Sequence, residues 1–437
     1  MSGLDPTTRF LIGLAVLLVL SRAARGVALR VGQPPVLAEI LTGVALGPTL
    51  LGRALPALHR ALFGADTMPM LNGLAQLGLA LYAFEIGHRL AAPAAPAGPG
   101  RRQDGAAGRS LRWLTAVSLL LPATAAVLIT GLLGGRRLQG THGGPVPLAV
   151  FLAAALGVTA VPVLARLLHD RGLEHTRVGR LSLASASLGD GVCWCLLAVA
   201  LACAGLIGTL QLVLGVAGAG AAVFLMHRRH TRPSSAAGSR SWGMAPMVAV
   251  VCLAAASSGA VGLHPMLGAL LLGAAWPTAW LGPGTADRLR STAATLLPCF
   301  FLGTGQQIDV GGALAAPGFL PLVLVLLVGA VATKLVACAV TGRLLGLGPR
   351  EAVRLGVLMN AKGLTEIVVL TAGYQAGLVS PLLFEALLVV ALVTTLLTGP
   401  ALAALGGGNA APAEDPTTAP AADPAPEPAE GRPVAAV

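Results

Sequence analysis

The sequence predicts an all-α membrane protein with about thirteen transmembrane helices. Of its 437 residues, 55% are hydrophobic and only 11% are charged, whereas a soluble domain needs about 25% charged residues to solvate its surface. The apolar residues form long continuous stretches of roughly 20 residues, the length that crosses a bilayer as a helix. Because the strands of a membrane barrel alternate apolar and polar residues, these stretches favour helices over a closed barrel.

Thirteen apolar spans follow one another along the chain. They cover approximately residues 7–24, 34–51, 69–88, 112–135, 146–169, 181–204, 206–226, 243–261, 264–281, 293–306, 317–344, 352–374 and 380–405. Residues 91–109 and the acidic segment from 408 onward are rich in Pro and Ala and cannot build a core. We therefore expect a transmembrane domain at 1–407 and a disordered tail at 408–437.

The placement of arginine predicts the orientation. The net charge is +11, but the basic residues lie in the gaps between spans, with 21 arginines in the odd-numbered loops and 4 in the even-numbered ones. By the positive-inside rule the odd-numbered loops are cytoplasmic. This predicts a multi-pass protein of the plasma membrane with its N-terminus outside and its C-terminus in the cytoplasm. The same scatter of charge argues against nucleic-acid binding.

Two pairs of segments indicate inverted-topology repeats. Pro35–Gly43 in the second span is similar to Pro265–Gly273 in the ninth, seven spans later. The fifth span contains Pro162 at mid-membrane, and the twelfth contains the polar stretch Asn360–Glu366, again seven spans later. An odd separation inverts the second copy, and interruptions at corresponding positions of two inverted halves are typical of a transport site.

Asp190 is the leading candidate for an ion- and proton-binding group. It lies near the middle of the sixth span between two glycines, and a charged group at membrane depth costs on the order of 3 kcal/mol or more. Burial favours the neutral form of a carboxyl group, which lets a proton and a cation compete for it. Thr159 and Asn360 supply neutral oxygen ligands suited to a transported Na⁺ or K⁺.

The other ionisable residues at membrane depth are expected to compensate charge or to line access routes. Lys362 is expected to compensate charge at the site and to neutralise Asp190, and Glu366, four residues later, is placed to pair with it locally. Lys334 is expected to snorkel or pair within its own span, or to belong to an access route. Glu39 and Glu85 either line access routes or lie at the interface.

Several functional classes lack their motifs. The chain contains no phosphate-binding G-x-x-x-x-G-K-[ST] sequence, no nucleotide-binding G-x-G-x-x-G after a strand and no hydrolase triad. The six cysteines lie in apolar spans and predict neither a disulfide framework nor a tightly bound metal. We expect no enzyme activity and no cofactor.

The chain resembles the second monovalent cation:proton antiporter family, which includes Kef-type and bacterial Na⁺/H⁺ and K⁺/H⁺ exchangers. The resemblance rests on Gln33–Pro48, Gly157–Arg166, Ala184–Asp190, Asn360–Glu366 and Leu378–Pro400. It implies thirteen helices, a dimerising scaffold and a mobile core that moves in an elevator-like manner around crossed, broken helices. It also implies ion and proton binding at Asp190 and charge compensation by Lys362.

Two departures from the family are expected to matter. Many members carry two adjacent acidic residues where this chain has Gly189 and Asp190, which makes 1:1 exchange the working hypothesis. The cytoplasmic nucleotide-binding domain of some relatives is missing from the chain. The leading function is therefore exchange of Na⁺ or K⁺ for H⁺ by a homodimer in the bilayer; the alternatives are a Kef-type K⁺ efflux protein and a proton-coupled exporter of a small organic solute.

Overall fold

The structure is a computed structural model of the 437-residue chain. It describes residues 5–406, apart from 31–32, 34, 92–104, 134, 175, 209, 212, 214–216, 218–241, 261–263, 278–279, 283 and 307–309. The described residues form helices joined by short loops and contain no named β-strand. Most of the predicted span 206–226 and the whole predicted tail 408–437 lie outside the described residues.

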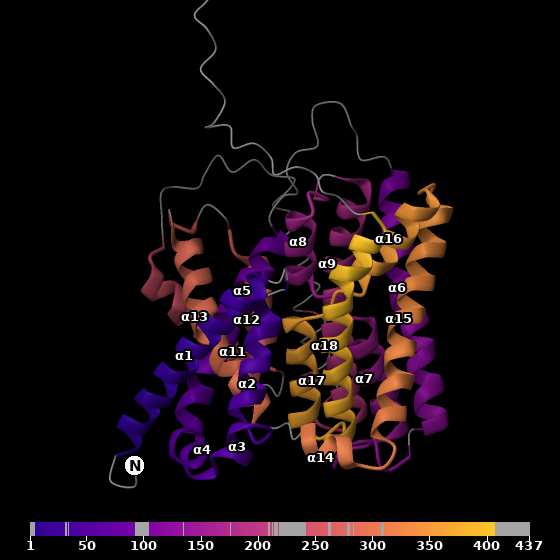
Figure 1. The fold of residues 1–437 in the computed structure, drawn as a ribbon. Coiled ribbons are helices and arrows are strands. Elements are labelled where there is room, and N and C mark those ends of the chain that lie inside the picture. The colour runs from indigo at the N-terminus through magenta and orange to yellow at the C-terminus, as the bar shows by residue number, and fades with distance from the viewer. Residues whose placement is uncertain are drawn as a thin grey trace, which may run out of the picture.

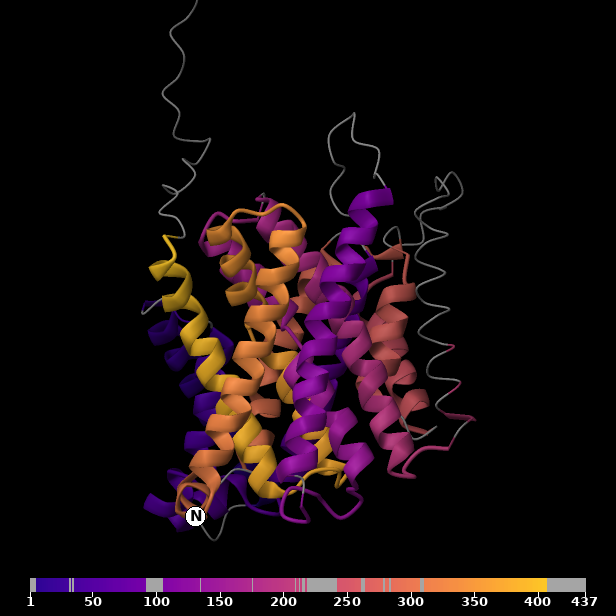
Figure 2. The ribbon, with the colours of Figure 1, turned by 90° about the vertical axis from the view of Figure 1, so that its right-hand side faces the viewer.

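The helices follow the predicted spans closely. In chain order they are α1 (Pro6–Arg30), α2 (Pro35–Leu46), α3 (Leu51–Ala54), α4 (Pro56–Phe63), α5 (Met68–Ala91), α6 (Gly105–Leu133), α7 (Pro145–Gly157), α8 (Val161–Asp170), α9 (Arg177–Cys203), α11 (Met244–Ala260), α12 (Pro265–Ala275), α13 (Thr285–Gly305), α14 (Val310–Ala315), α15 (Phe319–Leu344), α16 (Pro349–Met359), α17 (Leu364–Gln375) and α18 (Pro381–Ala404). Figure 1 shows them along one common direction, and Figure 2 shows the same arrangement from the side. The helix at the predicted span 293–306 is longer than expected, because its first two turns carry the charged residues that ended the apolar stretch.

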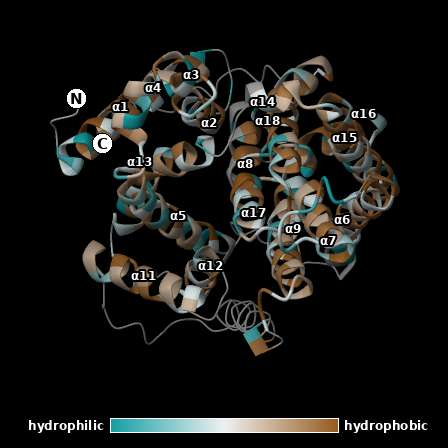
Figure 3. Cartoon of the chain, turned by 90° about the horizontal axis from the view of Figure 1, so that it is seen from below, coloured by the Kyte–Doolittle hydropathy of each residue, from teal (hydrophilic) through white to brown (hydrophobic). Residues whose placement is uncertain are grey.

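The helices form two bundles that lie next to each other (Figure 3). One, which we call the scaffold bundle, contains α1–α5 and α11–α13; the other, the core bundle, contains α6–α9 and α15–α18. Each bundle therefore combines a segment from the first half of the chain with a segment from the second half. The interleaving brings the two broken spans, α7–α8 and α16–α17, into the same bundle.

Glycines allow the backbones of the scaffold bundle to touch. A Cβ atom at Gly43 of α2 would lie 2.2 Å from the carbonyl oxygen of Phe301 in α13, and one at Gly87 of α5 would lie 2.0 Å from the carbonyl oxygen of Leu270 in α12. Close backbone approach through small residues is how helices pack in lipid, where no hydrophobic force drives them together. These contacts fix α2 against α13 and α5 against α12.

The outer surface is apolar. Within the part of the chain that the structure describes, five helices are long and apolar enough to cross a membrane, namely Pro6–Arg30, Arg109–Leu133, Arg177–Cys203, Phe319–Leu344 and Pro381–Ala404. On α15 the exposed large side chains recur at helical spacing: Leu320, Leu324, Val328, Val336 and Val340. One face of this helix thus presents a continuous apolar stripe suited to contact with lipid, while its opposite face holds the buried Lys334.

Candidate functional site

Two helix breaks meet in the middle of the core bundle. The first lies between α7 and α8, where Val158 and Ala160 are extended, and the second lies between Met359 and Leu364. The backbone N–H of Ala160 donates to the carbonyl oxygen of Ala361 at 2.9 Å. The breaks expected near Pro162 and in the stretch Asn360–Glu366 are therefore both present, and they are hydrogen-bonded to each other.

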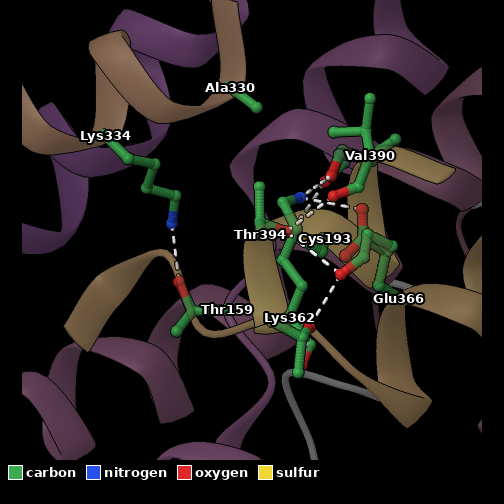
Figure 4. A network of polar contacts seen from close by, with 12 residues as sticks. Thr159, Cys193, Ala330, Lys334, Lys362, Glu366, Val390 and Thr394 are labelled. Carbon is green, nitrogen blue, oxygen red and sulfur yellow. Dashed lines mark hydrogen bonds and ion pairs between the residues drawn. The ribbon is translucent and has the colours of Figure 1, made fainter. Parts of the chain in front are cut away.

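Thr159 connects the breaks to α15. Its hydroxyl donates to the carbonyl oxygen of Met359 at 2.7 Å and accepts a hydrogen bond from Nζ of Lys334, also at 2.7 Å (Figure 4). Lys334 has only 1% of its surface exposed. The expectation that this lysine snorkels or pairs within its own helix is wrong: its side chain extends across the bundle and its ammonium group satisfies an oxygen of the first break.

Lys362, in the second break, contacts the helix that leads into the first break. Its Nζ donates to the carbonyl oxygen of Ala155, near the end of α7, at 2.8 Å, and to Oε1 of Glu366 at 2.7 Å (Figure 4). Both side chains of this ion pair are 1% exposed. The local Lys362–Glu366 pair expected from the sequence is therefore formed. Since the last carbonyls of a helix carry partial negative charge, the ammonium group also stabilises the buried end of α7.

Asp190 lies on α9 with 2% of its surface exposed. Neither of its carboxylate oxygens has a hydrogen-bond partner within the described part of the chain. No ammonium nitrogen of the described residues lies within 4.0 Å of this carboxylate, and Lys362, the partner expected from the sequence, is engaged with Glu366. The flanking glycines leave open space, since a Cβ atom at Gly189 would meet nothing within 4 Å.

Further oxygen atoms around the breaks are buried and lack a partner among the described residues. They are Oδ1 of Asn360, Oε2 of Glu366 and Oγ1 of Thr365. The amide group of Asn360 is oriented by a hydrogen bond from its Nδ2 to the carbonyl oxygen of Gly356 at 2.9 Å. Buried polar atoms without partners are rare in folded proteins, and uncharged or anionic oxygens of this kind are the ligands that hard cations prefer. Sequence reasoning missed Thr365.

Glu39 and Glu85 lie in the scaffold bundle. Glu39, on α2, has Nη1 of Arg25 at 3.9 Å from its Oε1. Glu85, on α5, accepts a hydrogen bond from Nε of Arg290 at 2.6 Å and also pairs with Arg89. The structure therefore gives both carboxylates arginine partners from the scaffold and joins neither to Asp190.

A polar cavity separates the two bundles on one side of the breaks. It has a volume of about 130 Å³ and lies between α5, α13 and the start of α12 on the scaffold side and α17 on the core side. Its polar lining residues are Asn72, Gln76, His264, Thr304, Thr371 and Gln375. At its edge the hydroxyls of Thr304 and Thr371 are 3.4 Å apart, one from each bundle. Sequence reasoning missed this cavity. His264, one of its lining residues, caps the start of α12: its Nδ1 accepts from the backbone N–H of Met266.

A family model described as the transmembrane region of sodium/hydrogen exchangers matches residues 14–406. The chain belongs to this exchanger family. The family consists of membrane transporters, so the expected resemblance and the expectation of a non-enzymatic protein are both confirmed. The matched residues include both helix breaks, Asp190 and the two buried lysines.

Similar exchangers come from bacteria, plants and yeast. The chain is 33% identical to the Na(+)/H(+) antiporter NhaS4 of Synechocystis, with 91% of this chain and 97% of that protein aligned. It is 30% identical to cation/H(+) antiporter 20 of Arabidopsis thaliana over 85% of this chain and 28% identical to K(+)/H(+) antiporter 1 of Saccharomyces cerevisiae over 91% of it. The chain spans about half the length of these plant and yeast proteins, 45% and 46% respectively.

The fold is that of a solved antiporter. The sodium proton antiporter MjNhaP1 of Methanocaldococcus jannaschii matches with a TM-score of 0.57, covering 90% of this chain and 95% of that chain. Its sequence is only 14% identical, so the comparison concerns the helical architecture. The all-α fold predicted from hydropathy is confirmed at this level.

Proposed function

We propose that the chain is a secondary transporter that exchanges a monovalent cation, Na⁺ or K⁺, for H⁺ by alternating access. The observation that carries the proposal is the carboxylate of Asp190, which is buried, has neither oxygen hydrogen-bonded and lies in the same bundle as two helix breaks. A carboxylate placed in this way gains strongly from binding either a proton or a metal cation, because both neutralise it. Family membership supports the same conclusion.

The site offers one exchangeable charge. Asp190, Glu366, Lys334 and Lys362 sum to zero when all four are ionised, and Lys362 and Glu366 already neutralise each other as a hydrogen-bonded pair. A cation that reaches Asp190 replaces the proton there, with Oδ1 of Asn360 as a candidate neutral ligand. Since Gly189 supplies no second carboxylate, the site favours exchange of one cation for one proton.

The membrane setting follows from the same proposal. We place about thirteen spans in the plasma membrane as two inverted repeats, with the N-terminus outside and residues 408–437 as a cytoplasmic tail. The polar cavity then lies on the external side and leads toward the breaks between the two bundles. The scaffold bundle, held together by its glycine contacts, is the candidate dimerisation surface, and the core bundle is the candidate mobile part.

Proton flux in everted membrane vesicles tests the proposal. Vesicles with an acid interior are expected to lose their pH gradient when Na⁺ or K⁺ is added, and Asp190→Asn is expected to abolish this response because an amide cannot exchange a proton for a cation. Asp287→Asn is the matched control, since the Asp287 side chain is 80% exposed and outside the core bundle. Full activity of Asp190→Asn contradicts the assignment.

The same assay separates the alternatives. K⁺ movement without any change of the pH gradient indicates a Kef-type efflux protein. Loss of the gradient with an organic cation but with neither Na⁺ nor K⁺ indicates an exporter of organic solutes.

A further inference from the structure

Five arginines gather at one end of the core bundle. Arg171 follows α8, Arg177 begins α9, Arg343 lies in the last turn of α15, and Arg350 and Arg354 lie in the first turns of α16. Their guanidinium groups hold helix ends together: Arg177 donates to the carbonyl oxygen of Leu345 at 2.7 Å and Arg343 to that of Leu347 at 3.0 Å. We call these five residues the arginine rim.

The arginine rim has no carboxylate partner within the described part of the chain. No Asp or Glu oxygen described there lies within 4.0 Å of these five side chains. The two neighbouring glutamates are used locally, since Glu174 contacts His169 at 2.9 Å and Glu351 accepts from the backbone N–H of Gly348 at 3.1 Å. Within the described side chains, the rim is therefore a concentration of positive charge with no carboxylate within 4.0 Å.

At the same end of the molecule, some arginines of the scaffold bundle have carboxylate partners. Arg25 has Glu39 as a partner, and Arg290 contacts both Glu85 and Asp287. A general preference for arginine on one side of a membrane explains why both bundles carry basic residues there. Among the described residues, three scaffold arginines at this end (Arg25, Arg89 and Arg290) have a carboxylate within 4.0 Å, whereas none of the five rim arginines has one.

Helix α18 ends inside the rim. The carbonyl oxygen of Gly399, near the end of α18, accepts a hydrogen bond from Nη2 of Arg171 at 3.0 Å. The carbonyl oxygen of Leu405, directly after the helix, accepts one from Nη2 of Arg354 at 3.3 Å. Each of these two arginines also has a buried nitrogen without a partner, Nη1 of Arg171 and Nε of Arg354. The chain that continues from α18 therefore starts among guanidinium groups that still have donors to satisfy.

That continuing chain is acidic. Residues 407–437 contain five carboxylates and one arginine, namely Glu414, Asp415, Asp423, Glu427, Glu430 and Arg432. Glu414 follows Leu405 by nine residues, and nine extended residues span about 30 Å. This length lets the first two carboxylates reach any of the five arginines, and the later ones can follow over the same surface.

We propose that the acidic segment 407–437 docks on the arginine rim of its own core bundle. The segment supplies carboxylates to five arginines that have none within 4.0 Å in the described part of the core bundle, and chain continuity limits how far the segment can lie from them. Because all five arginines belong to the core bundle, the docked segment remains with that bundle and does not connect it to the scaffold. Its attachment depends on exposed ion pairs, so it weakens as salt rises.

Cleavage by a glutamate-specific protease tests the docking in the full-length protein. In a neutral detergent, cleavage after Glu414 is expected to be about tenfold slower at 10 mM than at 500 mM salt, because the Debye length falls from about 30 Å to a few ångströms. The triple variant Arg177→Gln, Arg343→Gln, Arg350→Gln removes three exposed guanidinium groups and is expected to abolish this protection. The control Arg53→Gln, Arg60→Gln, Arg136→Gln removes equal charge elsewhere and is expected to retain it.

A second variant, changed only in the acidic segment, controls for misfolding caused by the arginine substitutions. Asp423→Asn, Glu427→Gln and Glu430→Gln leave every helix and the cleavage site unchanged, and they are expected to reduce the protection several-fold. Equal cleavage of wild type and both variants at low salt overturns the proposal. Nanodiscs with and without phosphatidylglycerol test whether anionic lipid headgroups bind the arginine rim in place of the acidic segment. Protection from cleavage in both kinds of nanodisc supports docking of the segment. Protection that is lost only with the anionic lipid overturns the docking for the membrane-embedded protein.

Discussion

Lys334 and Lys362 are both fully buried, and both ammonium groups donate to oxygen atoms at the first helix break, Lys334 to Thr159 and Lys362 to Ala155. Lys362, in the second break, is already neutralised by Glu366. Lys362 therefore links the two breaks, whereas Lys334 is a buried ammonium group with no carboxylate within 4.0 Å among the described residues.

Glu366→Gln is expected to destabilise the protein strongly. The change leaves the Lys362 ammonium group buried with a carbonyl but without a carboxylate, and breaking a buried ion pair on one side costs about 3–5 kcal/mol. Thermal unfolding followed by size-exclusion chromatography should show a clear drop in midpoint. The double variant Glu366→Gln, Lys362→Met removes both charges and should recover part of the loss. Glu351→Gln, at an exposed helix start, is the control and should leave the midpoint unchanged. An unchanged midpoint for Glu366→Gln contradicts a stabilising ion pair between Lys362 and Glu366.

Gly189→Asp is expected to change the charge balance of exchange. A Cβ atom at this position would meet nothing within 4 Å, so the start of an acidic side chain next to Asp190 displaces no neighbouring atom. It adds a second proton- or cation-binding group, and exchange should then respond to an imposed membrane potential, whereas wild-type exchange should not. Gly189→Asn has nearly the same shape and no charge, which makes it the matched control. Potential-sensitive exchange by the wild type would contradict the one-for-one stoichiometry.

At the scale of the helices, the sequence predicted what depends on local composition. Pro162 and the polar stretch from Asn360 marked both breaks, and the spacing of Lys362 and Glu366 predicted their ion pair. The contact between Lys334 and Thr159 joins residues 175 positions apart, and no local pattern indicates such a pair. The polar cavity could not be predicted for the same reason. Its polar residues are isolated on four helix segments, and only the packing of these helices brings them together.

Gly43→Ala is expected to disrupt the contact between α2 and α13. The new methyl group would lie 2.2 Å from the carbonyl oxygen of Phe301, so the two backbones must separate, and overpacking of this kind costs about 1–3 kcal/mol. Gly73→Ala on α5 is the control, since its Cβ would meet nothing within 4 Å and alanine favours a helix by up to about 1 kcal/mol. The thermal midpoint should fall for the first variant and hold or rise for the second; equal midpoints contradict the close packing.

At the scale of the whole molecule, Thr304 and Thr371 form a polar contact between the two bundles at the cavity. Their hydroxyls are 3.4 Å apart, with Thr304 in the scaffold bundle and Thr371 in the core bundle. If exchange requires the core bundle to move along the scaffold, this contact must break in every cycle. A covalent link at the same place would hold the two bundles in the arrangement seen in the structure.

Thr304→Cys combined with Thr371→Cys, in a background with the six native cysteines replaced, is therefore expected to stop exchange after treatment with a short bifunctional thiol reagent. A cleavable reagent should restore exchange on reduction. The matched control is Thr115→Cys with Ser185→Cys, whose parent hydroxyls are 3.1 Å apart and both lie in the core bundle; linking them should leave exchange unchanged, because α6 and α9 move together. Vesicle proton flux and gel mobility measure activity and linkage in the same sample. Undiminished exchange in a fully linked Thr304–Thr371 pair contradicts a moving core bundle.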